Sequence, residues 1–373
     1  MISIMTKKIK RRETKKIKRR DLILGTGAAA VAASSRTVQA QSKTFRWKMV
    51  TTWPPNFPGL GTSVVRMVKN IERASGGRIK IKLFSAGELV PAFEVFDFVS
   101  SGGAELGHGA AYYWRGKSEA AQIFTTLPFG LNAMELNGWH YFGGAQELYR
   151  ELYEPFNLLP FPCGNSGCQM GGWFKKSIDT IEDIKGLKMR IPGFGGEVLR
   201  RNGGTPVAMP GGEIFTALQT GTIDAAEWIG PYNDLAFGMH KVAKHYYYPG
   251  WHEGGPSLEC IINKEAFESL PDDLQAIVEI AIQSTNDTML AEFVARNASS
   301  LQQIRRMKDI EIKPFPNEVM AAFEKTTDEI IKEIEAKDPL FSKIYQSFAE
   351  YKKTASEWTK ISEYALLRNR YKD

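Results

Sequence analysis

Hydrophobic and polar positions follow two different periods in the first part of the chain. Residues 45–50, FRWKMV, alternate between apolar and polar side chains, which predicts a strand. Residues 64–71 carry apolar side chains at helical spacing, and the glycine pair at 76–77 predicts the end of this helix. A second alternating run, IKIKLF, follows at 79–84. The order strand, helix, strand indicates the beginning of a parallel α/β sheet.

Three aromatic residues stand at the end of the next expected strand: Tyr112, Tyr113 and Trp114. Ligands of open α/β sheets bind outside the carboxyl ends of the strands. These side chains are therefore either the walls of a pocket or residues at the edge of the core. We expect residues 122–162, which are rich in aromatic side chains, to be loop-rich and to pack around the entrance of a cleft.

A second group of elements surrounds Arg190. The sequence KMRI at 188–191 predicts a short strand, and two helices follow that end at Gly203 and Gly221. Glu227 and Trp228 then come at the end of a further strand, directly before a Gly-Pro pair. The same order of elements thus predicts a second α/β unit.

Two segments are expected to cross between these units: the Gly-rich segment at 163–174 and the Gly- and Pro-rich segment at 246–256. A hinge is expected at the second of them, where the chain returns between the lobes. This division predicts a first lobe at 41–165, a second lobe at 166–252, and a return through the hinge with C-terminal helices at 253–373. The chain becomes mostly helical from Pro271 onward.

The C-terminal helices are expected at about 317–337 and 340–371. In the second of these ranges, apolar residues such as Trp358, Ile361 and Tyr364 lie on more than one side of the helix. We therefore expect it to pack against a second surface, either the other lobe or another subunit.

Residues 1–40 have the pattern of a removable export leader: a basic start, small apolar residues, and Val38-Gln39-Ala40 before the cleavage point. The pair Arg19-Arg20 indicates the twin-arginine route, and the general secretory route stays open because Leu24 replaces a usual basic residue. The 12-residue run LILGTGAAAVAA is too short to cross a membrane, since a spanning helix needs about 20 residues. We expect a periplasmic location with the leader removed.

The leader also determines the charge of the chain. The whole sequence has a net charge of +6, but residues 41–373 contain 37 basic and 40 acidic residues. The excess of positive charge therefore belongs to the leader and does not indicate a nucleic-acid partner. Three cysteines, Cys163, Cys168 and Cys260, allow one disulfide in an oxidising compartment, but their positions do not say which pair would form it.

Arg190 is the first candidate binding residue, because a guanidinium can hold a carboxylate through two parallel hydrogen bonds. A lone Arg more often forms a surface ion pair. Gln169, Glu227 and Glu253 strengthen the functional interpretation, since each stands at the end of a different strand-like segment. The part of the chain after the leader contains no nucleophile elbow, phosphate-binding loop, dinucleotide fingerprint or zinc-protease helix, which makes catalysis the second choice.

Four segments together resemble the DctP-type extracytoplasmic solute receptors of TRAP transporters: QMGGWF, GLKMRIPGFGGEV, PGGEIFTALQTGTIDAAEWIGPYND and YYYPGWHEGGP. The sequence is most similar to the α-keto-acid-binding branch of this family. The resemblance covers nearly the whole chain after the leader. It implies an α/β, two-lobed periplasmic binding protein (type II-like), with hinge-linked lobes, that is not an enzyme and that delivers its ligand to a membrane permease.

The resemblance also implies roles for individual residues. Arg190 matches the carboxylate clamp, and Tyr112, Tyr113 and Asn165 match residues that line the ligand. Four residues match the ligands of a bridging metal ion, with sodium expected first and calcium second: Gln169, Glu227, Trp228 through its backbone, and Glu253. Relatives in the keto-acid branch can also form homodimers through their C-terminal helices.

The chemistry of the matched residues agrees with these roles, because oxygen ligands suit sodium or calcium. A cation offsets the two glutamates and can accept both the carboxylate of the ligand and its neighbouring keto or hydroxyl oxygen. This predicts selectivity for 2-oxo or 2-hydroxy acids. Three alternatives stay open: a calcium-dependent receptor for a 2-hydroxy acid such as lactate, a sensory receptor, and a secreted metal-dependent enzyme that uses Glu227 and Glu253 as an acid/base pair.

Overall fold

The computed structural model describes residues 43–372, which belong to one compact unit. The expected leader at 1–40 lies outside the described residues and stays a prediction. Within residues 43–372, no helix combines the length and the hydropathy that a membrane span requires.

The first sheet follows the predicted order of a parallel α/β unit, and one late strand joins it. β1 pairs in parallel with β2 and β3, whereas β10 runs antiparallel to both β3 and β4. In spatial order, the sheet consists of β2 (Ile79–Phe84), β1 (Phe45–Thr51), β3 (Leu106–Gly109), β10 (Ser257–Asn263) and β4 (Leu158–Asn165). We call this sheet and the helices on it the first lobe.

The second sheet contains the strand of Arg190. β6 pairs in parallel with β7 and β8, and β5 runs antiparallel to β8 and β9. In spatial order, the sheet consists of β11 (Glu311–Pro314), β9 (His245–Tyr248), β5 (Gly172–Phe174), β8 (Ala225–Ala226), β6 (Lys188–Arg190) and β7 (Thr205–Val207). We call this sheet and its helices the second lobe.

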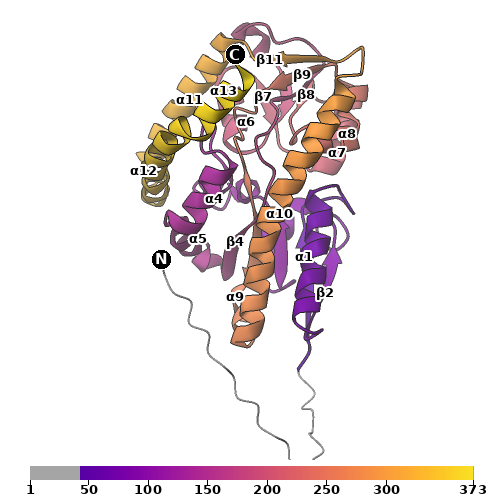
Figure 1. Ribbon diagram of the computed structural model, residues 1–373, viewed down its shortest axis with the longest axis vertical. Coiled ribbons are helices and arrows are strands. Elements are labelled where there is room, and N and C mark those ends of the chain that lie inside the picture. Colours follow the sequence, from indigo (N-terminus) through magenta and orange to yellow (C-terminus); the bar gives the residue numbers. More distant parts are fainter. Residues whose placement is uncertain (1–42, 373) are drawn as a thin grey trace, which may run out of the picture. The chain divides into compact units, whose positions relative to one another are not determined.

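Helices cover both sheets (Figure 1). The α-helices are α1 (Leu60–Ala74), α2 (Val95–Ser100), α3 (Ala121–Thr125), α4 (Ala133–Phe142), α5 (Ala145–Tyr153), α6 (Gly193–Arg201), α7 (Gly211–Thr220), α8 (Pro231–Phe237), α9 (Lys264–Glu268), α10 (Asp272–Ile304), α11 (Asn317–Glu335), α12 (Pro339–Ile361) and α13 (Glu363–Tyr371). Short 3₁₀ turns are η1 (Ala92–Glu94), η2 (Ala111–Trp114), η3 (Glu154–Phe156), η4 (Ile181–Ile184) and η5 (Met239–Lys241).

The long helix α10 joins the two lobes. It packs on α1 and β4 in the first lobe and on α8 in the second lobe. Figure 1 shows it in orange, running beside α1 and on towards α8. A continuous helix of this length acts as a shared support, because its hydrogen bonds resist bending between the two contacts.

The periodic segments form the elements that the sequence predicts. In β1, buried and exposed side chains alternate, and α1 buries the apolar stripe that includes Val64, Met67 and Ile71. At the end of α7, Gly221 has a left-handed backbone, which glycine adopts without steric cost. Local pattern and tertiary packing agree throughout these elements.

The expectation of loops at 122–162 is wrong. Helices α3, α4 and α5 and most of strand β4 occupy this range. Asn132 caps α4 by accepting hydrogen bonds from the backbone N–H groups of Met134 and Glu135, which is a helix-start signal that aromatic content had obscured.

Two smaller differences appear near the C-terminus. The edge strand β11 was not expected, although its four residues, EIKP, alternate between polar and apolar side chains. The helix expected at 340–371 breaks at Ser362, where the backbone leaves the helical region and separates α12 from α13. Cys163, Cys168 and Cys260 are all free thiols in this structure.

Glu259 is a buried carboxyl group in the core of the first lobe, on β10. The hydroxyl of Tyr153 donates to it over 3.0 Å, and Trp114 Nε1 and the Tyr149 hydroxyl also donate to it. Burial raises the pKa of Glu259 from 4.5 to about 7, although these three hydrogen bonds lower it in part. The group therefore keeps its proton in the folded protein at a pH at which the unfolded chain has lost it.

We expect the Glu259→Gln variant to lose part of the pH dependence of stability. Because the pKa is raised on folding, Glu259 lowers the free energy of unfolding as pH rises from 4.5 to about 7 and has no further effect above that range. The loss through this group is roughly 2–4 kcal/mol. Urea unfolding of the wild type and the variant at several pH values measures it.

The matched control for this prediction is Glu279→Gln, which changes an exposed residue on α10. This variant should retain the pH slope of the wild type. An unchanged slope in Glu259→Gln would contradict the assignment.

Candidate ligand and metal site

The candidate site lies where strands of the two sheets end. Arg190 is the last residue of β6, and Glu227 and Trp228 directly follow β8, its parallel neighbour. From the first lobe, Trp53 follows β1, and Tyr112 and Tyr113 lie on η2, just after β3. The strand ends of both sheets therefore place side chains at one site, as the rule for open α/β sheets predicts.

Two crossing segments connect the lobes at this site. One leads from β4 to β5 and carries Gln169, and the other leads from β9 to β10 and carries Glu253. Their backbones bond to each other: Gln169 N donates to Glu253 O over 3.2 Å, and Gly250 N donates to Gln169 O over 2.8 Å. A Cβ at Gly250 would lie 2.6 Å from Gln169 O, so only glycine allows this approach.

Arg190 and Glu227 form a buried ion pair, in which each side chain is 1% exposed. Arg190 Nη1 donates to Glu227 Oε1 and also, over 3.1 Å, to the backbone oxygen of Glu227. Arg190 Nε donates to Met209 O, and the guanidinium lies over the ring of Trp228 at 5.0 Å. The arginine is held by the ends of neighbouring strands and by an aromatic face.

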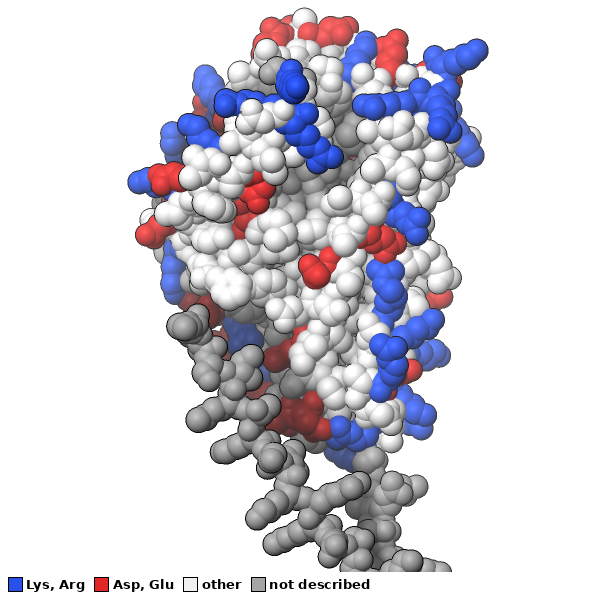
Figure 2. Space-filling model, viewed as in Figure 1, with Lys and Arg blue, Asp and Glu red and all other residues white. Residues whose placement is uncertain are grey.

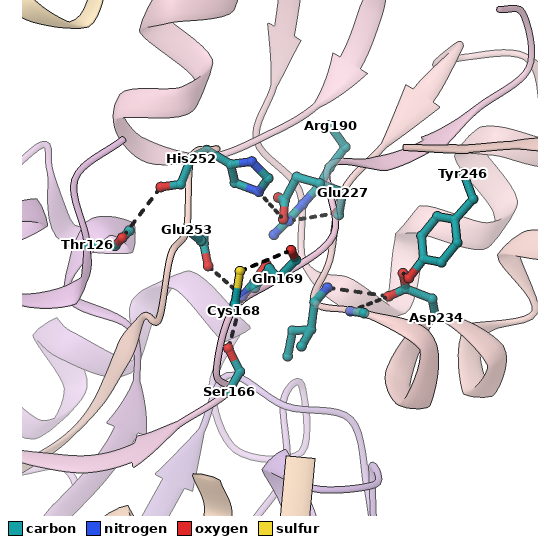
Figure 3. A network of polar contacts seen from close by, with 12 residues as sticks. Thr126, Ser166, Cys168, Gln169, Arg190, Glu227, Asp234, Tyr246, His252 and Glu253 are labelled. Carbon is teal, nitrogen blue, oxygen red and sulfur yellow. Dashed lines mark hydrogen bonds and ion pairs between the residues drawn. The ribbon is translucent and has the colours of Figure 1, made fainter. Parts of the chain in front are cut away.

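His252 approaches the other oxygen of the same carboxylate. Its Nε2 lies 3.3 Å from Glu227 Oε2, and its side chain is 2% exposed. Figure 3 shows the imidazole of His252 and the guanidinium of Arg190 both directed at Glu227. Glu227 therefore has a neighbour at each of its carboxylate oxygens.

Gln169 and Glu253 form the second part of the site (Figure 3). Gln169 Nε2 donates to Glu253 Oε2 over 2.6 Å and to Ser166 Oγ over 3.1 Å. Burial raises the pKa of Glu253 well above its usual value, the nearby charge of Glu227 raises it further, and Arg190 opposes this effect. The two carboxyl groups thus share one buried region that contains a single guanidinium among the described residues.

A small cavity of about 10 Å³, which is roughly the space that one water molecule needs, lies between these polar groups and the aromatic residues. Its lining includes Trp53, Tyr112, Tyr113, Gln169, Trp228 and Glu253. This volume lies far below the range of about 300–1,000 Å³ that is typical of pockets for drug-sized ligands. The side chains of the site therefore nearly close it in this structure.

Several buried polar atoms at the site have no hydrogen-bond partner among the described residues: Arg190 Nη2, Gln169 Oε1 and His252 Nδ1. Such atoms are costly, because burial removes their water without replacing it. One of them is a donor on a cation and another is an amide oxygen. They fit a ligand that brings an anionic group and a positive ion.

Glu227, His252 and Glu253 offer donor atoms that all lie within 4.8 Å of one another. Such a group has the composition and spacing of a site for a small cation, since carboxylates and imidazole are common metal ligands. Gln169 Oε1 adds a further oxygen in the same network.

The structure brings most of the expected site residues together. Asn165 is buried but uses its side chain for the backbone: its Oδ1 accepts from Gly167 N over 2.8 Å, and its Nδ2 donates to Gly255 O over 3.0 Å. These bonds tie the two crossing segments together. A ligand contact for Asn165, like the other assigned roles, stays a prediction.

Two residues of the site were not predicted from the sequence. Trp53 lines the cavity from a Pro-rich loop, and its position directly after an expected strand was the available signal. Asp234 is buried and accepts hydrogen bonds from Ile229 N, Gly230 N, Trp173 Nε1 and the Tyr246 hydroxyl. It fixes the loop after Trp228, a role that no sequence pattern indicates.

Comparison with known proteins gives the family. The sequence model of the DctP family, described as bacterial extracellular solute-binding protein, family 7, matches residues 49–338. A relative from Nostoc sp. PCC 7120, named monocarboxylate 2-oxoacid-binding periplasmic protein, is 41% identical over 358 residues, which cover 93% of this chain and 97% of the relative.

Two solved structures are similar over nearly their whole length. The TRAP periplasmic solute binding protein from Colwellia psychrerythraea, with bound calcium and pyruvate, is 43% identical with a TM-score of 0.86, covering 88% of this chain and 100% of that one. The corresponding protein from Pseudoalteromonas atlantica T6c, with bound sodium and pyruvate, is 43% identical with a TM-score of 0.85, covering 87% and 99%.

These similarities confirm the predicted α/β fold with two lobes and the predicted family. The match extends over both sheets and includes all the residues of the candidate site. The chain therefore belongs to the DctP family of bacterial extracellular solute-binding proteins, the receptors of TRAP transporters.

Proposed function

We propose that this chain is an exported receptor that binds a small 2-oxo monocarboxylate together with a metal ion and delivers the acid to the membrane subunits of a TRAP transporter. The observation that carries the proposal is the pair of buried atoms without partners, Arg190 Nη2 and Gln169 Oε1. A carboxylate would satisfy the first, and a cation would satisfy the second.

Arg190 would hold the carboxylate of the acid. Its Nη1 and Nε are already used by Glu227 and by Met209 O, which fixes the plane of the guanidinium. The remaining nitrogen, Nη2, is buried and free to donate. Because attraction between charges is strong in a dry site, one charge-assisted hydrogen bond there contributes substantially to affinity.

Gln169, Glu227, Glu253 and the backbone oxygen of Trp228 would hold the metal ion, as the resemblance implies. The ion would supply positive charge between the two carboxyl groups and would favour an acid that has a second oxygen beside its carboxylate. A plain monocarboxylate lacks this neighbouring oxygen. The site would therefore favour 2-oxo acids, with 2-hydroxy acids as weaker ligands.

The charge of the site bears on the identity of the ion. With His252 counted as neutral, Arg190, Glu227, Glu253 and one bound carboxylate sum to two negative charges. Calcium balances this sum, whereas sodium, the ion expected first, leaves one buried negative charge that is costly. We therefore propose that calcium binds more tightly than sodium, in line with the calcium and pyruvate of the Colwellia relative.

We also propose a homodimer in which the C-terminal helix of each copy covers the other. On α12 and α13, Trp358, Ile361 and Leu366 are 65%, 72% and 68% exposed. A groove between α4 and α10 exposes Met134, Phe142 and Ile280. Figure 2 shows mostly uncharged surface between these two helices. In a two-fold symmetric dimer, the C-terminal helices of each copy would pack into the groove of the other copy, which would bury both apolar surfaces.

The first prediction is that pyruvate raises the melting temperature of dialysed protein in calcium or sodium, and that acetate and succinate do not. At one hundred times its dissociation constant, a ligand stabilises the folded state by about 2.7 kcal/mol.

Arg190→Lys should weaken pyruvate binding at least about 100-fold in calorimetry, because a lysine keeps the charge but loses the planar donors. Lysine is preferable to alanine here, since alanine would leave Glu227 buried without its partner.

Arg200→Lys is the matched control, because Arg200 is an exposed arginine on α6 that pairs with Glu197. It should bind pyruvate like the wild type. Binding that survives in Arg190→Lys would remove Arg190 from the site. NMR of the released acid should show it unchanged, and a chemical product would favour the enzyme alternative.

For the dimer, we expect Ile361→Glu combined with Leu366→Glu to give a monomer in light scattering, because burying two carboxylates in an apolar interface is costly. Lys360→Glu introduces the same residue at an exposed polar position of α12 and should leave the dimer intact. A monomeric wild type would rule the interface out.

A further inference from the structure

We propose that His252 is a direct ligand of the metal ion, so that the site binds borderline divalent cations such as manganese in addition to hard ions. This inference rests on the proposed metal site and adds a residue to it. Neither the sequence match nor the comparisons assign a role to His252. Its neighbour in sequence, Glu253, is one of the expected ligands.

The distance between His252 and Glu227 supports a shared ion. His252 Nε2 lies 3.3 Å from Glu227 Oε2. At this separation the two side chains form a long hydrogen bond. Two ligands that bind one metal ion at about 2.1 Å lie about 3.0–3.4 Å apart in octahedral or tetrahedral geometry. The observed distance matches the edge of such a polyhedron.

The surroundings of His252 give its Nε2 one partner, Glu227, and leave its Nδ1 without one among the described residues. The side chain is 2% exposed, and Nδ1 has no hydrogen-bond partner among the described residues. Among the described residues, no hydrogen-bond partner of Nδ1 decides whether this nitrogen carries the proton. With the proton on Nδ1, Nε2 presents its lone pair towards Glu227, and the donor atoms of Glu227, His252 and Glu253 lie within 4.8 Å of one another.

The backbone holds the imidazole in this place. Thr126 Oγ1, in the first lobe, donates to His252 O over 3.4 Å, and the Cβ of His252 packs closely against Gly195 of α6. His252 is thus fixed between the two lobes, and a larger residue at Gly195 would displace it. A preorganised nitrogen of this kind gains affinity, because little rotamer freedom remains to be lost on binding.

An imidazole changes the choice of metal. Oxygen ligands alone favour sodium, calcium or magnesium, whereas an added nitrogen increases affinity for first-row transition metals. Two carboxylates, one imidazole and one amide oxygen form a mixed set that suits manganese. A divalent ion also balances the charge of the site when a monocarboxylate is bound.

Manganese binding to the metal-free full chain tests this proposal. The loss of the free Mn²⁺ signal in electron paramagnetic resonance gives the affinity. Electron spin echo envelope modulation of the bound ion then reports a coordinated nitrogen. We expect a nitrogen signal that changes when histidine is labelled with ¹⁵N. In His252→Phe and His252→Gln, we expect the signal to vanish and the dissociation constant to rise at least about tenfold.

His245→Gln is the matched control, since His245 also faces a glutamate, Glu311, at 3.2 Å but lies on β9 and is partly exposed. It should keep the affinity and the nitrogen signal. The wild-type spectrum does not depend on the folding of any variant, and a bound ion without a histidine signal, or no bound ion, overturns the proposal.

Pyruvate binding in calcium, measured on the same wild-type preparation, distinguishes a failure of the His252 proposal from a failure of the proposed receptor function. If pyruvate binds and manganese shows no histidine nitrogen, His252 is not a ligand and the proposed receptor function stands. If no 2-oxo acid binds with any cation, the proposed function itself fails, whatever the manganese spectrum shows.

Discussion

The buried pair of Arg190 and Glu227 is the interaction on which the site depends. Two unlike charges in a dry region are tolerated only when each has close partners. Here the partners come from the ends of β6 and β8, from Met209 O and from the ring of Trp228. The second carboxyl group, Glu253, disturbs this balance, since burial and the charge of Glu227 raise its pKa well above the usual value and Arg190 only partly opposes them. A bound cation would offset the charge of an ionised Glu253. An acid with a second oxygen next to its carboxylate could bind this cation as well, which gives the preference for such acids.

The two crossing segments connect this charge balance to the fold. Gln169 and Glu253 lie on different crossings, and backbone hydrogen bonds hold the crossings together. A change in the relative position of the lobes would therefore move Gln169 and Glu253, the proposed metal ligands, relative to the aromatic residues of the first lobe. This arrangement gives a physical reason to expect that ligand binding and the relative position of the lobes are coupled, because the residues around the site come from both lobes.

Much of the fold followed from local patterns, and the failures have local reasons. Alternation in β1 and the helical stripe of α1 predicted both elements. The helices at 122–162 were missed because aromatic side chains dominated the segment. Strand β11 was missed although its four residues alternate, because this short run lies between the long helices α10 and α11. The candidate site came chiefly from the resemblance: by itself, Arg190 looked like a surface ion pair, yet its side chain is 1% exposed.

The sequence by itself determined the two α/β units, the order of their elements and the chemical types available at the strand ends, because periodicity and turn residues act over short distances. Only the tertiary structure decided which charges meet. It brought Glu227 between Arg190 and His252, turned the Asn165 side chain to the backbone of the crossings, and left Arg190 Nη2 and Gln169 Oε1 without partners. These contacts join segments distant in the chain, and their energies depend on burial, which no local pattern specifies.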